Sequence, residues 1–159
     1  GGKVGVFSGL LEIVETDDEL AAVIGHEIAH VLLQHANQRM SAELLRSLGG
    51  LVAAASTTDM DEEDRALLLA AYGLGTQVGL MLPYSRAHER QADRLGLVIA
   101  ARAGYDPRAA IDFWNKMASR SGGGPPEFLS THPSYGTRID TLREAMPEAL
   151  SLYRQAGQP

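Results

Sequence analysis

Apolar and polar positions alternate with a helical period between residues 16 and 32. Apolar side chains recur there at mostly helical spacing, at Leu20, Val23, Ile24, Ile28, Val31 and Leu32. The preceding Thr16-Asp17-Asp18-Glu19 is a capping box, in which the Thr16 hydroxyl accepts a hydrogen bond from the Glu19 amide and the Glu19 side chain reaches back. The pattern predicts a core helix that begins directly after Thr16.

Most of the remaining chain also shows helical patterns. We expect helices over residues 35–40, 44–55, 85–103, 107–120, 135–145 and 147–155. Gly104 is suited to follow a helix end, and Asp106-Pro107 is suited to begin the next helix. Only the segment from Lys3 to Phe7 has the pattern of a strand. The predicted fold class is therefore mainly α with a small N-terminal β element, α+β overall.

A single strand does not make a sheet. Either strands upstream of Gly1 pair with the segment from Lys3 to Phe7, or this segment is an edge that stays partly open. An open edge can bind an extended peptide through main-chain hydrogen bonds, so a polypeptide substrate is one expected partner; plain packing as an edge strand is the other interpretation. Because the sequence begins without methionine or an apolar signal region, we expect a targeting segment to precede it.

Residues 66–82 form an apolar stretch that approaches the length of a membrane span. The length is at the lower limit for a span, and three glycines and two polar residues dilute its hydrophobicity. We therefore expect a helix or helical hairpin that is ended by Pro83 and buried against the layer of the residue 16–32 helix. Docking onto a membrane surface, as a peripheral association, stays open.

Composition narrows the classes of function. With 159 residues, the chain is long enough for one domain with a proper core, over residues 1–159. A formal net charge of −6 and the absence of a Lys/Arg run argue against nucleic acid as a partner. The sequence contains no cysteine, which excludes disulfides and a zinc site built from thiolates.

The candidate chemistry lies in His26-Glu27-Ile28-Ala29-His30. Residues four apart on a helix advance by about 400°, so both imidazoles lie on one face, one turn apart. Two neutral imidazole nitrogens at this spacing can bind one tetrahedral Zn²⁺, and Glu27 can take a proton from a water molecule that the zinc acidifies. Two histidines without a metal are the alternative, but polar groups inside an apolar helix are costly unless something pairs with them.

Two histidines leave a zinc ion one protein ligand short. The metzincin arrangement needs a glycine and a third histidine after His30, at positions where this chain has Leu33 and Ala36. A second predicted helix offers Glu89 and Asp93, four residues apart on one face. Glu89 can bind the metal while Asp93 holds a ligating imidazole; a plain surface helix with arginine partners is the alternative.

Three segments together resemble the motifs of a known family. They are similar to the zinc metallopeptidases that include the CAAX prenyl proteases, HtpX and BepA. The resemblance covers nearly the whole chain, from Gly1 to about Leu142. The segments that carry it are Gly25-His-Glu-Ile-Ala-His30, Ser85-Arg-Ala-His-Glu-Arg-Gln-Ala-Asp93 and Thr131-His-Pro-x-x-x-x-Arg138-Ile.

The resemblance implies a zincin-like metalloprotease domain, of the gluzincin kind, with one zinc ion per chain. It implies His26, His30 and Glu89 as the metal ligands and Glu27 as the catalytic base. It also implies Asp93 as a supporting residue that is sometimes assigned as a proton donor.

His132, in the third segment, has more than one interpretation. It could stabilise an oxyanion in the cleft, or bind the metal as a fourth ligand that plugs the site; a loop histidine without a role is the plain alternative. Arg138 could stabilise the same cleft or pair with a helix end.

The sequence thus predicts a zinc-dependent endopeptidase in which the zinc and Glu27 activate water. The resemblance implies unfolded or misassembled envelope proteins as substrates, and a bacterial periplasm or cell envelope as the location. The alternative from another class is a zinc-stabilised, chaperone-like binding module whose site is plugged.

Overall fold

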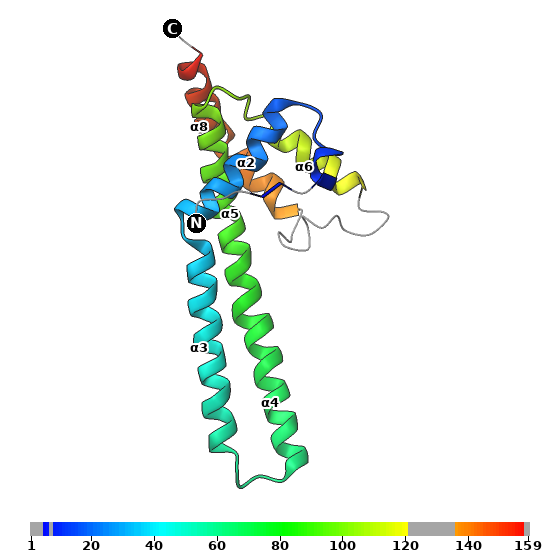
Figure 1. Cartoon of the computed structure of the whole chain (residues 1–159), viewed down its shortest axis with the longest axis vertical. Helices are drawn as coiled ribbons and strands as arrows, with labels where there is room; N and C mark the ends of the chain where they lie inside the picture. Colours follow the sequence, from blue (N-terminus) through cyan, green and yellow to red (C-terminus); the bar gives the residue numbers. More distant parts are fainter. Residues whose placement is uncertain (1–4, 7, 121–135, 158–159) are drawn as a thin grey trace. The chain divides into compact units, whose positions relative to one another are not determined.

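A computed structural model describes residues 5–6, 8–120 and 136–157, and this part of the chain is mainly helical (Figure 1). The elements are α1 (Ser8–Leu11), α2 (Asp17–Leu32), α3 (His35–Ser56), α4 (Glu62–Thr76), the π-helix η1 (Gln77–Met81), α5 (Leu82–Arg102), α6 (Ala109–Arg120) and α8 (Gly136–Ala156). They belong to two compact units, one formed by residues 1–33 and 88–159 and the other by residues 34–87. The prediction of a mainly α protein is confirmed.

The first unit has a hydrophobic core between packed helices. Helix α6 packs against both α2 and α8. Each helix contributes the apolar side chains that its helical spacing places on one face. The buried core comprises Leu10, Ile13, Val23, Leu97, Ala101, Ala110, Phe113, Trp114, Met117, Leu142, Ala145 and Ala149.

Helix α2 begins at the predicted capping box. The Thr16 hydroxyl accepts a hydrogen bond from the Glu19 amide at 3.2 Å. The Glu19 carboxylate reaches back to the amide of Glu15 at 2.8 Å, one residue before the N-cap. It also pairs with Nζ of Lys116, on α6, at 2.5 Å. These contacts fix where α2 starts and how its first turn lies against α6, so they fix the direction in which its later side chains point.

Helices α2 and α5 approach each other most closely at two glycines. A Cβ atom added to Gly25 would lie 2.6 Å from the Gly96 carbonyl oxygen, and one added to Gly96 would lie 2.7 Å from the His26 nitrogen. Neither position has room for a larger side chain, because the neighbouring atoms belong to helix backbones. The glycine contact therefore sets the spacing between α2 and α5, one residue away from His26.

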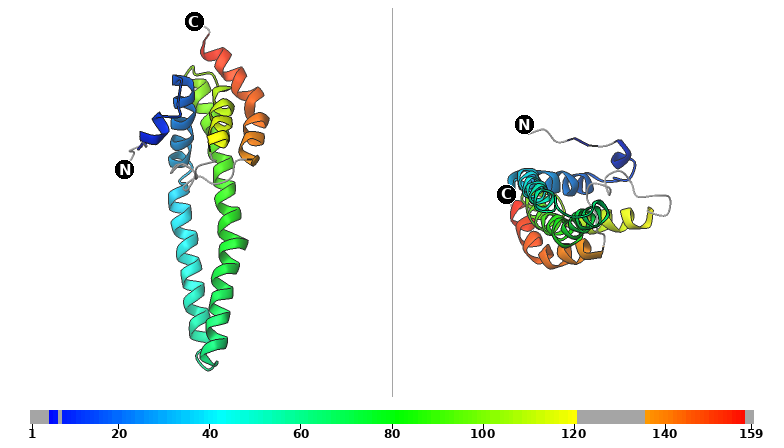
Figure 2. Two further views of the ribbon diagram at one scale, coloured as in Figure 1. Left: turned by 90° about the vertical axis from the view of Figure 1, so that its right-hand side faces the viewer. Right: turned by 90° about the horizontal axis from the view of Figure 1, so that it is seen from below.

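The second unit is a hairpin of two long helical arms, α3 and α4, joined by residues 57–61 (Figures 1 and 2). The arms meet where the Tyr72 hydroxyl donates a hydrogen bond to the Arg46 carbonyl at 2.8 Å. The Tyr72 ring lies over Gly49 and Gly50. The sequence predicted a buried helix or helical hairpin over residues 66–82, which instead lie in α4, η1 and the first residue of α5. The predicted burial is wrong, because none of the residues of α4 or η1 is buried.

Two prolines behave differently from the sequence prediction. Pro83 does not end a helix, since the chain passes through the π-helix η1 into α5, and the Leu82 amide bonds to the Gln77 carbonyl five residues back. Pro147 lies inside α8, which is one helix rather than two. Its ring is exposed, while Ala145 and Ala149 on either side are buried in the core. Core packing therefore holds the helix together where proline removes a backbone hydrogen bond.

The predicted N-terminal β element is not shown. Lys3, Val4 and Phe7 lie outside the described residues, and Gly5 and Val6 are not in a strand. The segment that follows is the short helix α1, whose Leu10 packs into the core. Pairing of a substrate with an edge strand therefore stays a prediction.

Candidate metal centre

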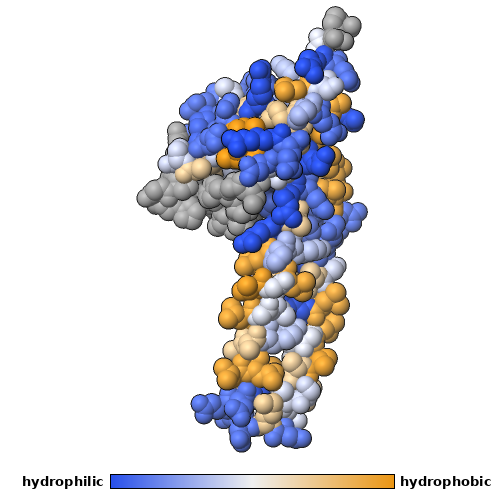
Figure 3. Space-filling model, turned by 180° about the vertical axis from the view of Figure 1, so that it is seen from behind, coloured by the Kyte–Doolittle hydropathy of each residue, from blue (hydrophilic) through white to orange (hydrophobic). Residues whose placement is uncertain are grey.

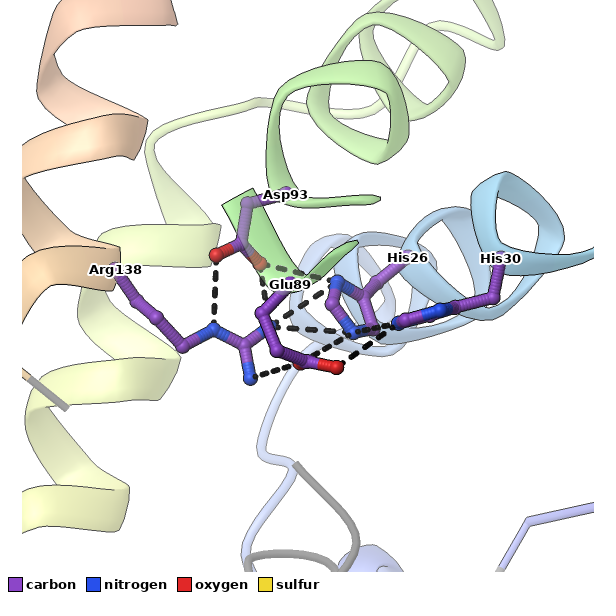
Figure 4. A network of polar contacts seen from close by, with 5 residues as sticks. All are labelled: His26, His30, Glu89, Asp93 and Arg138. Atoms are coloured by element: carbon purple, nitrogen blue, oxygen red, sulfur yellow. Dashed lines mark hydrogen bonds and ion pairs between the residues drawn. The ribbon is translucent and has the colours of Figure 1, made fainter. Parts of the chain in front are cut away.

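Three polar side chains from two helices converge beside the α2–α5 crossing (Figure 4). Helix α2 supplies His26 and His30, whose Nε2 atoms lie 3.0 Å apart. Helix α5 supplies Glu89, whose two carboxylate oxygens lie 3.4 Å from these two nitrogens, one from each. His26 and Glu89 are buried, and His30 is half-buried. The residues expected to be ligands from their spacing thus lie together in the described part of the chain.

The distances between the two imidazole nitrogens and the carboxylate group are close to those around a small divalent cation. Ligand atoms that lie about 2.1 Å from a tetrahedral zinc ion lie about 3.4 Å from one another. Here the two Nε2 atoms lie 3.0 Å apart, and each lies 3.4 Å from a different oxygen of the Glu89 carboxylate. Two imidazole nitrogens and one carboxylate oxygen are also the donor types of catalytic zinc sites. The residues therefore fit a zinc ion in both chemistry and spacing.

Asp93 lies one turn after Glu89 on α5 and contacts the other ring nitrogen of His26. The distance between Asp93 Oδ1 and His26 Nδ1 is 3.0 Å. If Nδ1 carries the proton and donates it to the carboxylate, the Nε2 lone pair of His26 points toward His30 and Glu89. In that tautomer, Asp93 orients the imidazole and leaves the lone pair of Nε2 available to bind a metal.

Arg138, from α8, joins the two carboxylates and is the residue whose role the sequence did not resolve. Its Nε donates to Asp93 Oδ2 at 2.8 Å, its Nη2 also pairs with Asp93, and its Nη1 lies 3.1 Å from Glu89 Oε2. The guanidinium lies over the Trp114 ring, 3.7 Å from its centroid. Arg138 is fully buried, so its charge is shared with the two carboxylates rather than with water.

The shifts in pKa reflect this network. Burial and the charge of Arg138 lower the pKa of His26, but hydrogen bonds to Asp93 and Glu89 outweigh them and leave it raised. Burial raises the pKa of Asp93, but hydrogen bonds to His26 and Arg138 and their charges outweigh it and leave it lowered. Asp93 is therefore ionised at neutral pH and serves as an acceptor for both neighbours.

The remaining candidate residues have different positions. Glu27 is half-buried and follows His26 on α2. His132 lies outside the described residues, so its role stays a prediction. His35 and His88, which spacing assigns to structural roles, are both buried and do not belong to the group of three donors. The contact of Trp114 with Arg138 joins α6 to α8 and could not be read from the sequence.

A signal for Arg138 was present in the sequence but ambiguous. Glu89 and Asp93 lie on one helix face, and two buried carboxylates beside a metal need further positive charge or hydrogen-bond donors. Arginine is by far the more common cation of this chain, so residue type alone does not select one. The pairing becomes evident only when α8 is placed against α5.

Comparisons with known proteins show which family the chain is similar to. Residues 1–146 match the model of Peptidase family M48. The mitochondrial metalloendopeptidase OMA1 of Bos taurus is 38% identical over 99% of this chain and 31% of its own length. The OMA1 protein of Saccharomyces cerevisiae is 36% identical over 98% of this chain and 44% of its own length.

Bacterial relatives are similar over almost the same region. A protein of Vibrio cholerae named putative beta-barrel assembly-enhancing protease is 34% identical over 91% of this chain and 31% of its own length. No solved structure matches the chain. The chain spans less than half the length of these relatives. Because the family model matches most of its residues, the chain belongs to peptidase family M48.

Proposed function

We propose that the chain is the catalytic domain of a zinc-dependent endopeptidase, with His26, His30 and Glu89 as the zinc ligands and Glu27 as the general base. The observation that carries the proposal is the convergence of the two histidine Nε2 atoms, 3.0 Å apart, on the Glu89 carboxylate, which places one oxygen 3.4 Å from each of them. Membership of a peptidase family and relatives named metalloendopeptidases support it.

When bound, zinc would polarise the scissile carbonyl and lower the pKa of a water molecule at the site. Glu27 takes a proton from the attacking water and delivers it to the leaving amine, so one carboxylate serves as base and then as acid. Its place beside His26 on α2 supports this role, since one rigid helix carries both the base and two ligands.

Asp93 and Arg138 act as positioning residues in this proposal. Asp93 accepts hydrogen bonds from His26 and Arg138, and its lowered pKa keeps it ionised at neutral pH. Arg138 neutralises part of the negative charge of Glu89 and Asp93 and holds both carboxylates toward α2.

The substrates we propose are polypeptides, in unfolded or misassembled form, in the cell envelope. The name of the Vibrio cholerae relative supports the envelope, whereas other relatives are named mitochondrial. The compartment predicted from the sequence, a bacterial periplasm or envelope, therefore stays a proposal.

The test combines metal content with cleavage of casein by the purified chain. We expect about one zinc ion per chain and turnover in the wild type, retained zinc with lost turnover in Glu27→Gln, and loss of both in Glu89→Ala. Glu148→Gln, an exposed residue on α8, is the matched control and should behave as the wild type. Zinc binding without cleavage in the wild type would contradict the peptidase proposal and favour the plugged binding module.

A further inference from the structure

The hairpin of α3 and α4 exposes most of its large apolar side chains. Figure 3 shows apolar residues along the arms and hydrophilic residues at the end of the hairpin where residues 57–61 join the arms, here called the tip. On α3, for example, Leu45 is 70% exposed and Val52 is 69% exposed. The exposed large apolar residues of this unit are Met40, Leu44, Leu45, Leu48, Leu51, Val52, Met60, Leu67, Leu68, Leu74, Val78, Leu80 and Leu82.

The distribution of side chains on α3 is the reverse of that in a water-soluble hairpin. The half-buried residues of α3 recur at helical spacing and are small or charged: Ala42, Glu43, Arg46, Gly49, Gly50, Ala53 and Ala54. The leucines lie on the other side and are exposed. A soluble hairpin places its large apolar residues between the helices, whereas helices in lipid meet through small residues and expose large apolar ones.

Several polar side chains on the arms form hydrogen bonds or ion pairs within the hairpin. Thr76 donates to the Tyr72 carbonyl at 2.9 Å, and Ser41 donates to the Asn37 carbonyl at 3.0 Å. Between residues 40 and 56 the charged side chains are Glu43 and Arg46, which pair at 2.5 Å. Residues 66–82 contain no charged side chain. The hydrocarbon core of a bilayer offers polar groups no hydrogen-bond partners, so polar side chains there must pair with one another or with the backbone.

The lengths of the arms match a bilayer. Helix α3 has 22 residues, which corresponds to about 33 Å of helix. Helices α4 and η1 have 15 and 5 residues, which corresponds to about 30 Å. The hydrocarbon core of a bilayer is about 30 Å thick. The helical segment Glu62–Arg102 also passes, by length and composition, as a candidate membrane span, and its apolar window is not buried in the protein.

Charge differs between the two ends of the hairpin. The tip and the first turn of α4 carry five carboxylates and one cation, Arg65. The carboxylates belong to Asp59, Asp61, Glu62, Glu63 and Asp64. The opposite end carries Arg39 and Arg86, together with Tyr84, whose hydroxyl bonds to Gln38. Cationic residues are retained on the side from which a segment inserts, and tyrosines favour the membrane interface. The end with Arg39 and Arg86 therefore fits the side of the membrane from which the hairpin inserts, where anionic lipid headgroups attract cations. The acidic tip fits the opposite side of the membrane.

We infer that the α3–α4 hairpin spans a lipid bilayer, with the tip in the water on the far side. A second copy of the chain is the other occupant that could cover the leucines. It explains neither the match to the bilayer thickness nor the charge difference between the two ends. The inference does not depend on the proposed peptidase activity.

The lack of native cysteine allows a direct test on the whole chain. Single cysteines are introduced at Leu51 and Leu74 in the middle of the arms, at Met60 in the tip, and at Leu11 in α1 as the control. Each variant is synthesised in the presence of vesicles of phosphatidylethanolamine and phosphatidylglycerol, floated, washed with alkaline carbonate and treated with a membrane-impermeant maleimide.

We expect the chain to remain with the vesicles after the wash. L11C should be labelled at once, M60C only after the vesicles are permeabilised, and L51C and L74C only after detergent is added. Labelling of M60C at the rate of L11C in sealed vesicles would overturn the inference, because the hairpin would then lie on the surface. Recovery of the chain as a soluble monomer or dimer would also overturn it.

A paired substitution provides a second readout. Leu51→Glu with Leu74→Glu should abolish resistance to the carbonate wash, whereas Leu11→Glu should leave it unchanged. Circular dichroism of both variants checks that their helices form. Equal resistance to the wash in two helical variants would contradict the inference.

Discussion

Replacing Gly96 by alanine tests whether the glycine contact sets the geometry of the metal site. The added Cβ atom would lie 2.7 Å from the His26 nitrogen, 2.8 Å from the His26 Cα atom and 2.9 Å from the Gly25 carbonyl carbon. These are backbone atoms inside a helix, so no side-chain rotation relieves the overlap. Restoring ordinary contact requires α2 and α5 to separate by roughly 0.5–0.7 Å.

This separation has a cost in stability and a cost in function. Overpacking of this kind costs about 1–3 kcal/mol, of which the higher helix propensity of alanine returns up to about 1 kcal/mol. A net loss of up to about 3 kcal/mol lowers the Tm of a chain of this size by up to roughly 12 °C. Because His26 and His30 move away from Glu89, we also expect zinc affinity and kcat/KM to fall by about tenfold or more.

The control is Gly75→Ala, at a helical glycine with no atom within 4 Å of an added Cβ. Thermal denaturation, zinc competition with a chelator and casein cleavage are measured for both variants. Gly75→Ala should leave all three unchanged or raise the Tm slightly. If Gly96→Ala matches Gly75→Ala in stability and zinc affinity, the contact does not set the geometry of the site.

Three further predictions concern the polar network. Asp93→Asn should weaken zinc affinity about 10–100-fold, measured by chelator competition, because an amide no longer favours the His26 tautomer that binds metal; unchanged affinity would exclude the positioning role. Arg138→Met should cost about 3–5 kcal/mol, measured by chemical denaturation, because it leaves the Asp93 and Glu89 carboxylates buried without their cation. Arg143→Met, on the exposed face of the same helix, should cost about 0–1 kcal/mol, and equal losses in both variants would contradict this reasoning. The pKa of Asp93 is lower in the folded state than in the unfolded state. The contribution of ionised Asp93 to the free energy of unfolding is therefore complete above the ordinary carboxyl pKa. It is lost as the pH falls through the lowered pKa of the folded state. Thermal denaturation of the metal-free chain should therefore show a steeper loss of Tm in acid for the wild type than for Asp93→Asn.

Local features of the site were predictable because helix periodicity is local. The spacing of His26 and His30 fixes their common face, and Thr16 with Glu19 marks where that helix begins. The same periodicity places Glu89 and Asp93 on one face of α5. None of these steps requires knowledge of how the helices pack.

Contacts between distant segments were not predictable in the same way. The approach of Gly25 to Gly96 depends on how two helices cross, and a helical glycine alone does not indicate a crossing. The pairing of Arg138 with Asp93 joins residues 45 positions apart, and the sequence left its partner open. Both contacts are long-range, and both determine where the predicted ligands lie.

Residues 66–82 are exposed or half-buried, whereas the sequence predicted that they would be buried. The sequence predicted a buried helix or helical hairpin there, because the expectation from hydrophobicity assumed that leucines pack inward. These residues instead lie in the continuous helical run of α4, η1 and the start of α5. In the structure, the inner face of α3 is occupied by residues such as Gly49, Gly50 and Ala53, while the leucines remain exposed. Pro83 was taken as a helix end because the π-helix that precedes it has no sequence signal.

The central claim is that His26, His30 and Glu89 together hold one zinc ion. X-ray absorption spectroscopy at the zinc edge, on the zinc-loaded whole chain and on Glu89→Ala, tests it most directly. The account predicts a wild-type shell with two imidazoles and a carboxylate oxygen at about 2.0–2.2 Å, and loss of bound zinc in Glu89→Ala. Full zinc occupancy in Glu89→Ala, or a wild-type spectrum without imidazole scattering, would contradict it.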